Sequence, residues 1–392
     1  MPDAGAGLLA ALCARIARAG PLTVAAYMQA CLADADGGYW QKRASIGATG
    51  DFITAPEISQ IFGELIGLWC AVVWRDLGRP ACVRLVELGP GRATLMRDAL
   101  RAARAAPNFL AAASVHLIEA SRPLRALQRR TLAAAAPPAA AAVPRAAGAR
   151  TGAFPAIAWH ATIAGVPPGP AIIIANEFLD ALPIRQFVRG TVHWSERMVA
   201  LDPGDPSGDR LAFVTGPESP AATLLAPVGL RRSAPGTIAE ICPAGLALAG
   251  ALGARLARQP GAALFIDYGY FPSAPGPTVR AVQGHRPVPP LAGPGAVDLS
   301  AHVDFAAFAE AARVGGAETH GPVSQGRFLA ALGAEARLAA LSARATPMQR
   351  RALEGGLKRL LDPDAMGDLF KVMALVSPGL PQPAGFEANV EP

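Results

Sequence analysis

The sequence predicts an α/β protein built on a nucleotide-binding, Rossmann-like sheet, and three apolar runs carry this prediction. The first run ends in Glu87-Leu-Gly89-Pro-Gly91, and leucines and alanines at helical spacing follow it at once. The second and third runs, Ile172–Ala175 and Ala263–Ile266, have the length of buried strands, and each meets polar side chains at its end. Such a sheet binds its ligands beyond the carboxyl ends of the strands.

The two glycines of the first turn favour a ligand that lies close to the backbone. A glycine adopts positive φ easily and has no Cβ to keep a bound molecule away from the N–H groups. The turn is a weak signal when taken alone, because the third glycine of the dinucleotide fingerprint is missing. A strand–helix turn that binds nothing is the alternative interpretation.

Length and composition exclude several classes of protein. The chain has 392 residues, of which 52% are hydrophobic, so a sizeable core is expected and general disorder is not. The net charge of +6 is spread over scattered arginines, and no nucleic acid partner is expected. No apolar run approaches the ~18 residues of a membrane helix. The five cysteines lack CxxC spacing, which favours thiols in a reducing compartment and gives no support for a metal site.

Two helices are predicted over residues 8–33, with a break at Gly20-Pro21 and Thr23 as the cap of the second helix. The start of the chain lacks the basic segment of a secretory signal. Residues 1–78 are therefore expected to form an N-terminal helical cap with a lid loop.

The polar loop that precedes the glycine turn holds three candidate functional residues, Asp51, Thr54 and Glu57. It ends at Pro56, a residue suited to the first turn of a helix, and this helix is expected to continue through Cys70 with one apolar face. A polar loop of this length is often a functional lid, and a plain connector is the alternative.

Acidic side chains follow two of the predicted strands. Glu119 comes directly after the short apolar run Val115–Ile118, where an acid accepts hydrogen bonds from ribose hydroxyls in nucleotide-binding folds. A solvent-facing glutamate is the alternative there. Asn176, Glu177 and Asp180 follow the next strand, at the sheet edge where chemistry is expected.

Two insertions are expected within residues 79–392, the sheet-bearing domain. Short alternating runs predict an antiparallel β meander over about 184–235. A stretch rich in proline and glycine, about 271–300, is predicted to be a loop, and its length favours a role. It contains His285, for which a catalytic role and a loop histidine held by a neighbour both stay open.

Six motifs occur together along nearly the whole chain. They are Gly50-Asp-Phe-Ile-Thr-Ala-Pro-Glu57-Ile-Ser-Gln60, Glu87-Leu-Gly-Pro-Gly91, His116-Leu-Ile-Glu119-Ala-Ser121, Asn176-Glu-Phe-Leu-Asp-Ala-Leu-Pro183, Ile266-Asp-Tyr-Gly269 and Met366-Gly-Asp-Leu-Phe-Lys371. This set resembles the MidA-like family of class I methyltransferases, whose mitochondrial members assist assembly of respiratory complex I. Ala93 stands where the family often has glycine, and Ala55 where it often has serine; both residues are small.

The resemblance implies a sheet of seven, mostly parallel strands and an enzyme that depends on S-adenosyl-L-methionine. Mitochondrial relatives dimethylate an arginine of a complex I subunit symmetrically, so the implied substrate is a protein arginine. The implied cofactor-binding residues are Glu87, Gly89, Gly91, Glu119, Asn176, Thr54 and Glu57. Within this set the glycines would face the methionine moiety, Glu87 its charged groups, and Glu119 the ribose.

The methyl acceptor needs a second set of side chains. Carboxylates at Glu177 and Asp180 have the chemistry to grip a guanidinium and direct one nitrogen toward the methyl group. Proton acceptors after methyl transfer are Glu177, Asp267 or His285. The substrate-binding candidates are Asp51, Asp267 and Tyr268.

Two other functions compete with a methyltransferase. A nicotinamide-dependent oxidoreductase also uses a glycine turn and a ribose acid, although the missing third glycine disfavours it. A non-catalytic assembly factor that keeps the fold is the other. A bacterial cytoplasmic location is expected, with the mitochondrial matrix for eukaryotic relatives, because the resemblance begins near Leu8 and leaves no room for a presequence. The oligomeric state is open, and a homodimer is compatible with the sequence.

Overall fold

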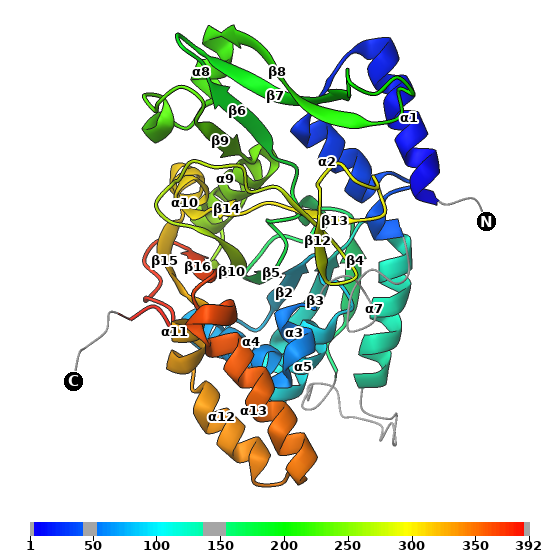
Figure 1. Ribbon diagram of the computed structural model, residues 1–392. Helices are drawn as coiled ribbons and strands as arrows, with labels where there is room; N and C mark the ends of the chain where they lie inside the picture. The colour runs from blue at the N-terminus through cyan, green and yellow to red at the C-terminus, as the bar shows by residue number, and fades with distance from the viewer. Residues whose placement is uncertain (1–3, 42–52, 136–153, 388–392) are drawn as a thin grey trace. The chain divides into compact units, whose positions relative to one another are not determined.

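The computed structural model describes residues 4–41, 53–135 and 154–387, and Asp51 lies outside them (Figure 1). The described residues form two compact units. The insertion unit contains the described part of Met1–Phe52 with Leu179–Leu248 and Gly269–Phe308, and the sheet unit contains the described parts of Ile53–Phe178, Ala249–Tyr268 and Ala309–Pro392. Residues 53–78, which the sequence predicts as part of the N-terminal cap, cluster with the sheet unit.

The sheet unit is built on strands in the order β15-β16-β10-β5-β2-β3-β4 (Figure 1). The strands from β10 to β4 run parallel, and β15 and β16 run antiparallel to their neighbours. The predicted mostly parallel sheet is confirmed, and an eighth strand of two residues, β14 (Val303–Asp304), pairs parallel with the end of β10 beside the seven strands of this order. Their bounds are β2 (Val83–Leu88), β3 (Ala113–Ile118), β4 (Ile157–His160), β5 (Ala171–Asn176), β10 (Gly261–Tyr270), β15 (Glu318–Ser324) and β16 (Phe370–Val376).

Helices enclose this sheet and complete its core. Helix α4 packs closely on α5, because Gly67 has no Cβ to collide with the backbone of Ala99. The buried carboxylate of Glu64 on α4 binds Arg101 of α5 at 2.9 Å and Arg337 of α12 at 2.7 Å. The helices with most or all of their residues in this unit are α3 (Ala55–Ile58), α4 (Gln60–Asp76), α5 (Thr94–Ala102), α6 (Pro107–Ala112), α7 (Arg122–Ala135), α9 (Pro243–Arg258), α10 (Phe305–Val314), α11 (Gln325–Ala331), α12 (Ala334–Ser342) and α13 (Pro347–Leu361).

One predicted helix is in fact two helices. The expected helix from Pro56 through Cys70 is interrupted at Ser59, whose backbone is extended with φ −151° and ψ 133°. The Ser59 hydroxyl accepts a hydrogen bond from the N–H of Ile61 and so caps α4. Pro56 does occupy the first turn of α3, as its type predicts.

The insertion unit contains the predicted meander as part of an antiparallel sheet of order β1-β7-β6-β9, with β8 paired to β7. Thr23 caps α2 by accepting from the N–H of Ala26, as predicted. The elements are α1 (Ala4–Ala19), β1 (Leu22–Thr23), α2 (Val24–Ala33), β6 (Arg185–Arg189), β7 (Trp194–Leu201), β8 (Leu211–Ser219), α8 (Pro220–Leu225) and β9 (Ile238–Ile241). The described residues include no helix of the length and hydropathy needed to cross a membrane.

The stretch predicted as a loop over about 271–300 is instead partly ordered as a small sheet. Its strands β11 (Arg280–Gln283), β12 (Arg286–Val288) and β13 (Asp298–Ser300) pair in the order β12-β11-β13, and β14 (Val303–Asp304) follows. The strands are short, and prolines and glycines surround them, so their alternation is too brief to stand out in the sequence.

Candidate functional site

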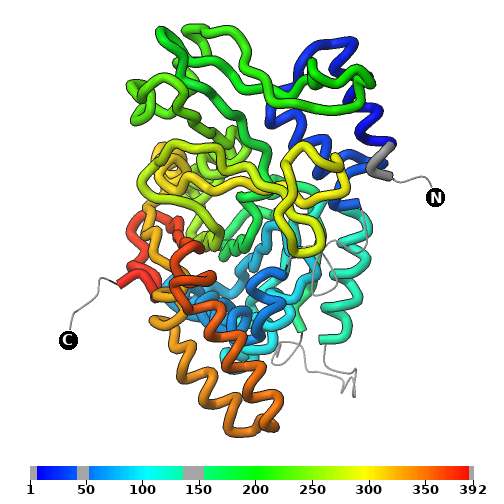
Figure 2. Tube along the Cα trace, in the orientation of Figure 1, coloured from blue at the N-terminus to red at the C-terminus, as the bar shows by residue number. Residues whose placement is uncertain are grey.

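The turns that leave the carboxyl ends of β2, β3, β5 and β10 carry candidate residues, and they lie at one edge of the sheet because these strands are parallel. Figure 2 traces the path of the chain through these strands. After β2, Gly89, Gly91 and Ala93 have φ of 59°, 50° and 61°, so three residues of the turn are left-handed. A Cβ on Gly89 would lie 2.6 Å from the ring of Phe178, which follows β5. Glycine at position 89 is therefore required both by its φ and by the neighbouring strand end.

Glu87, one residue from the end of β2, has a buried carboxylate that is 3% exposed. Within the described residues, its Oε2 atom has no hydrogen-bond partner. Burial raises the pKa of Glu87 to about 8. A buried, unpartnered carboxylate beside a glycine turn fits a ligand that brings a cation or a hydrogen-bond donor to it.

Glu119 follows β3 directly, as predicted for a ribose acid. Its Oε1 accepts from the N–H of Ser121 at 2.8 Å, and its Oε2 accepts from the amide of Gln128 at 3.1 Å. Burial raises the pKa of Glu119, and these hydrogen bonds and the charge of Arg125 act in the opposite direction. Sequence reasoning missed Gln128, although a glutamine within the predicted helix after Ser121 was visible.

The motif after β5 is tied to α3. Glu177 has φ 49°, uncommon for a residue with a side chain. Its Oε1 accepts from the backbone N–H of Ala55 at 2.9 Å and from the amide of Asn176 at 3.1 Å. Two of the predicted site residues, Asn176 and Glu177, are thus in contact at the end of β5, and Glu177 also contacts the first residue of α3.

Asp267 holds the backbone beside this motif. Its Oδ2 accepts from the N–H of Phe178 at 3.1 Å and its Oδ1 from the N–H of Tyr268 at 3.0 Å, and the residue is 1% exposed. The ring of Tyr268 lies edge-on to that of Phe370 at 5.4 Å between centroids. In the structure Asp267 therefore orients two strand ends.

The end of the predicted lid loop contacts the glycine turn. Glu57 on α3 accepts a short hydrogen bond from the hydroxyl of Thr94, the first residue of α5, and lies 3.9 Å from Nε of Arg92. Thr54 is the N-cap residue of α3, and its carbonyl accepts from the N–H of Glu57.

Asp180 and His285, the other two predicted catalytic residues, belong to the insertion unit. Asp180 is 8% exposed, and its carbonyl accepts from the N–H of Ala301. His285 is exposed, with φ 62°, in the two-residue turn that joins β11 to β12. The catalytic roles of both residues stay predictions.

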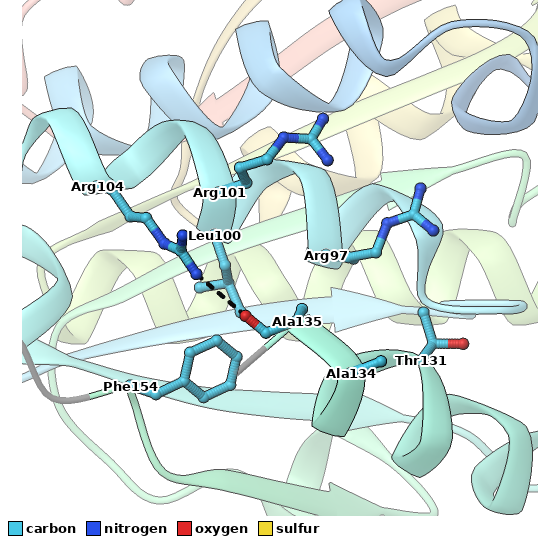
Figure 3. Close-up of a pocket in the computed structure, with 8 residues that line it drawn as sticks. All are labelled: Arg97, Leu100, Arg101, Arg104, Thr131, Ala134, Ala135 and Phe154. Carbon is cyan, nitrogen blue, oxygen red and sulfur yellow. Dashed lines mark hydrogen bonds between the residues drawn. The ribbon is translucent and has the colours of Figure 1, made fainter. Parts of the chain in front are cut away.

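Other cavities lie elsewhere among the described residues, and one of about 400 Å³ is lined by Leu77, Gln259 and Ser377 with their neighbours. A cavity of about 390 Å³ between α5 and α7 is lined by Arg97, Leu100, Arg101, Arg104, Thr131, Ala134, Ala135 and Phe154 (Figure 3). Its arginines are engaged within the fold, since Asp98 and Glu64 bind two of them and Arg104 donates to the Ala135 carbonyl. A cavity of about 250 Å³ in the insertion unit has Leu224 and Val228 at its rim, which are 70% and 76% exposed.

Comparisons with known proteins agree on one family. A family model described as "putative S-adenosyl-L-methionine-dependent methyltransferase" matches residues 65–323, which include β2, β3, β5 and β10. The protein arginine methyltransferase NDUFAF7 of Mus musculus is 36% identical over 368 residues, which are 92% of this chain and 82% of the mouse protein. The Drosophila melanogaster homologue is 36% identical over 95% of this chain and 86% of its own length.

Solved structures agree with the sequence relatives. A Burkholderia thailandensis protein crystallised with S-adenosyl-homocysteine superimposes with a TM-score of 0.81 and 29% identity, over 99% of this chain and 97% of that one. A native structure from the same organism gives a TM-score of 0.78 and 30% identity. These two structures cover both compact units.

Proposed function

The chain belongs to the S-adenosyl-L-methionine-dependent methyltransferase family, and we propose that its methyl acceptor is an arginine side chain of a partner protein. The observation that carries the choice of arginine is the 36% identity, over 92% of the chain, with a mouse protein named as a protein arginine methyltransferase. The exposed apolar rim at Leu224 and Val228 supports a protein as the partner, because such patches are typical of protein contact surfaces.

S-adenosyl-L-methionine is the cofactor, and when bound it supplies an activated methyl group on a sulfonium. We propose that the edge formed by the ends of β2 and β3 holds it. The unpartnered carboxylate of Glu87 suits the cationic methionine end, and the open backbone at Gly89 and Gly91 allows close approach. Glu119, fixed by two hydrogen bonds, suits the ribose hydroxyls. Asn176, Thr54 and Glu57 lie in the segments tied to this edge.

For the acceptor, Glu177 has the properties of a positioned carboxylate. Hydrogen bonds from Ala55 and Asn176 hold its Oε1 in place. A carboxylate held in this way attracts a guanidinium and leaves the charge away from the nitrogen that is to be methylated. That nitrogen would form its new bond to the methyl carbon as the bond from this carbon to the sulfonium sulfur breaks, which leaves S-adenosyl-L-homocysteine. The methylated nitrogen must then lose a proton, for which Glu177, Asp267 or His285 is the proposed acceptor.

The partner and compartment follow from the resemblance. We propose a subunit of respiratory complex I as the methylated protein and a reducing compartment, the bacterial cytoplasm, as the location, with the mitochondrial matrix as the location of eukaryotic relatives. All five cysteines are free in the structure, which supports a reducing compartment.

Calorimetric titration with S-adenosyl-L-methionine, with NADH and NADPH as parallel ligands, tests the cofactor site. Saturable binding of S-adenosyl-L-methionine alone is expected. Incubation with methyl-labelled cofactor and an extract from cells that lack this protein then tests the acceptor by mass spectrometry. Label on arginine is the expected result, and label only on lysine or on small molecules would contradict the proposal.

A further inference from the structure

Gln128, on α7, is completely buried in the sheet unit, and its side chain joins three separate segments. Its Nε2 donates to the carbonyl of Gly91 at 2.9 Å and to Oε2 of Glu119 at 3.1 Å. Its Oε1 accepts from the indole N–H of Trp159 on β4 at 3.0 Å. One amide therefore bridges the glycine turn after β2 and the acid after β3.

The chemistry of the partners fixes the orientation of this amide. A carbonyl and a carboxylate only accept, so they must face the NH₂ group of Gln128. The indole N–H only donates, so it must face the amide oxygen. A flipped amide would lose all of these contacts inside the core, where unpaired polar groups are costly.

Trp159 is itself held in place. The guanidinium carbon of Arg129, the next residue on α7, lies 4.1 Å from the centre of the indole ring. The indole N–H thus has a fixed direction, and it orients the Gln128 amide from the side opposite to Glu119.

We propose that Gln128 is a positioning residue of the cofactor site, which holds Glu119 and the carbonyl of Gly91 in a fixed relation so that the carboxylate is presented to the ribose hydroxyls. This inference rests on the proposed role of Glu119. With Ser121 on one oxygen and Gln128 on the other, the carboxylate plane is set, and each oxygen keeps a lone pair for a hydroxyl. Gln128 acts through Glu119 and the turn and not by touching the ligand itself.

If Gln128 positions Glu119, replacing Gln128 should weaken the preference of the site for a ligand that has its ribose hydroxyls. The ligands are S-adenosyl-L-homocysteine and its analogue without the two ribose hydroxyls, titrated by calorimetry, so the readout is binding and not turnover. The wild-type protein should bind the hydroxyl-bearing ligand about 10- to 100-fold more tightly, the range for hydrogen bonds to a charged group. Gln128→Met should reduce this ratio about fivefold or more.

Two further variants separate positioning from general destabilisation. Leu132→Ala opens the core one turn further along α7, at a residue that is 1% exposed, and should keep the wild-type ratio even if the protein unfolds more easily. Gln128→Glu keeps an acceptor for the Trp159 indole but removes the donor to Glu119, so it should lose the preference for the hydroxyl-bearing ligand. It replaces Gln128→Met in the test if that variant does not fold.

The outcomes are distinguishable. If wild type shows no preference for the hydroxyl-bearing ligand, the role of Glu119 and the role of Gln128 both fall. If Glu119→Gln loses the preference while both Gln128 variants retain it, the role of Glu119 stands and Gln128 is structural only. Loss of the preference in Glu119→Gln and in the Gln128 variants, with retention in Leu132→Ala, supports the proposal.

Discussion

The carboxylate of Glu177 accepts a hydrogen bond from the backbone N–H of Ala55 at 2.9 Å, across 122 positions of sequence. Ala55 is the first residue of α3, and Thr54, its N-cap residue, makes no side-chain cap bond. From the turn after β5, Glu177 therefore accepts a hydrogen bond at the start of α3, as a local capping side chain usually does. The stretches around Thr54 and around Glu177, which carry two of the six motifs, are thus joined by a hydrogen bond.

Replacing Glu177 should release the start of α3. Glu177→Ala removes the acceptor, leaves the Ala55 N–H without its partner and should cost about 1–2 kcal/mol, as for other lost caps. Glu177→Gln retains an amide oxygen and should keep most of the protection of this N–H. Hydrogen exchange at the Ala55 amide measures the difference. Equal protection in both variants would show that the carboxylate does not hold α3.

The buried carboxylate of Glu87 should make the protein less stable as the pH rises. Its pKa is raised from 4.5 to about 8, so the folded protein binds a proton that the unfolded chain has released between these values. The stability linked to this proton is complete below pH 4.5 and lost as the pH rises through about 8, on the order of 5 kcal/mol in total.

Glu87→Gln removes the titrating group and should remove this pH dependence. Urea unfolding of both proteins over this range gives the difference in free energy at each pH. As the pH rises, the variant should gain stability relative to wild type. At high pH, where Glu87 of wild type is charged, the variant should bind S-adenosyl-L-homocysteine more weakly than wild type does. A constant difference across the range would contradict a buried protonated carboxyl.

Much of this fold could be predicted because the central strands are buried on both faces. Runs such as Ile172–Ala175 are continuously apolar for that reason. Glu87, near the end of β2, and Glu119, just after β3, are visible as acidic interruptions of such runs. The same logic could not find Gln128, whose partner Gly91 is 37 positions away. Its function depends on how α7 packs on the sheet, and no local pattern encodes that.

The break between α3 and α4 is a local feature that periodicity does not predict. Apolar residues keep helical spacing across Ser59, so periodicity alone predicts one helix. The break arises because Ser59 turns to an extended backbone and caps α4 with its own hydroxyl. Ser competes for backbone hydrogen bonds in this way, which is a reason to weigh it as an internal cap.

A pair of histidines, of which His116 is buried, should produce acid sensitivity. Nδ1 of His116 on β3 lies 2.9 Å from Nε2 of His160 on β4, and Ser114 contacts the other nitrogen of His116 at 3.0 Å. Burial, with the charges of His160, Arg84 and Arg255, lowers the pKa of His116 from 6.5 to about 4. The unfolded chain takes up a proton first, so stability is complete above pH 6.5 and falls by about 3 kcal/mol toward pH 4.

His116→Gln keeps a side chain that can hydrogen-bond but does not titrate. Chemical unfolding of this variant should therefore show a smaller loss of stability from pH 6.5 to about 4 than wild type shows. Because Glu87 acts in the opposite sense over part of this range, each effect is to be read as a difference between variant and wild type. A wild-type loss that His116→Gln reproduces in full would exclude the histidine pair as its source.

Gly89→Ala should be more damaging than its left-handed backbone alone explains. The added Cβ would lie 2.6 Å from Cδ2 of Phe178, and φ at this glycine is 59°. Gly78→Ala is the matched control, since φ there is 81° and nothing lies within 4 Å of the added carbon. The control should lose about 1 kcal/mol from backbone strain, and Gly89→Ala about 2–4 kcal/mol because the ring must also shift.

A further variant, Phe178→Leu, removes the aromatic ring that the Cβ added in Gly89→Ala would contact. Combined with Gly89→Ala it should recover stability relative to the sum of the two single changes, as expected for residues in direct contact. Unfolding free energies of the four proteins give the coupling directly. Additive losses would mean that the turn after β2 and the end of β5 are not packed as the structure describes, and that Gly89 is required for its φ alone.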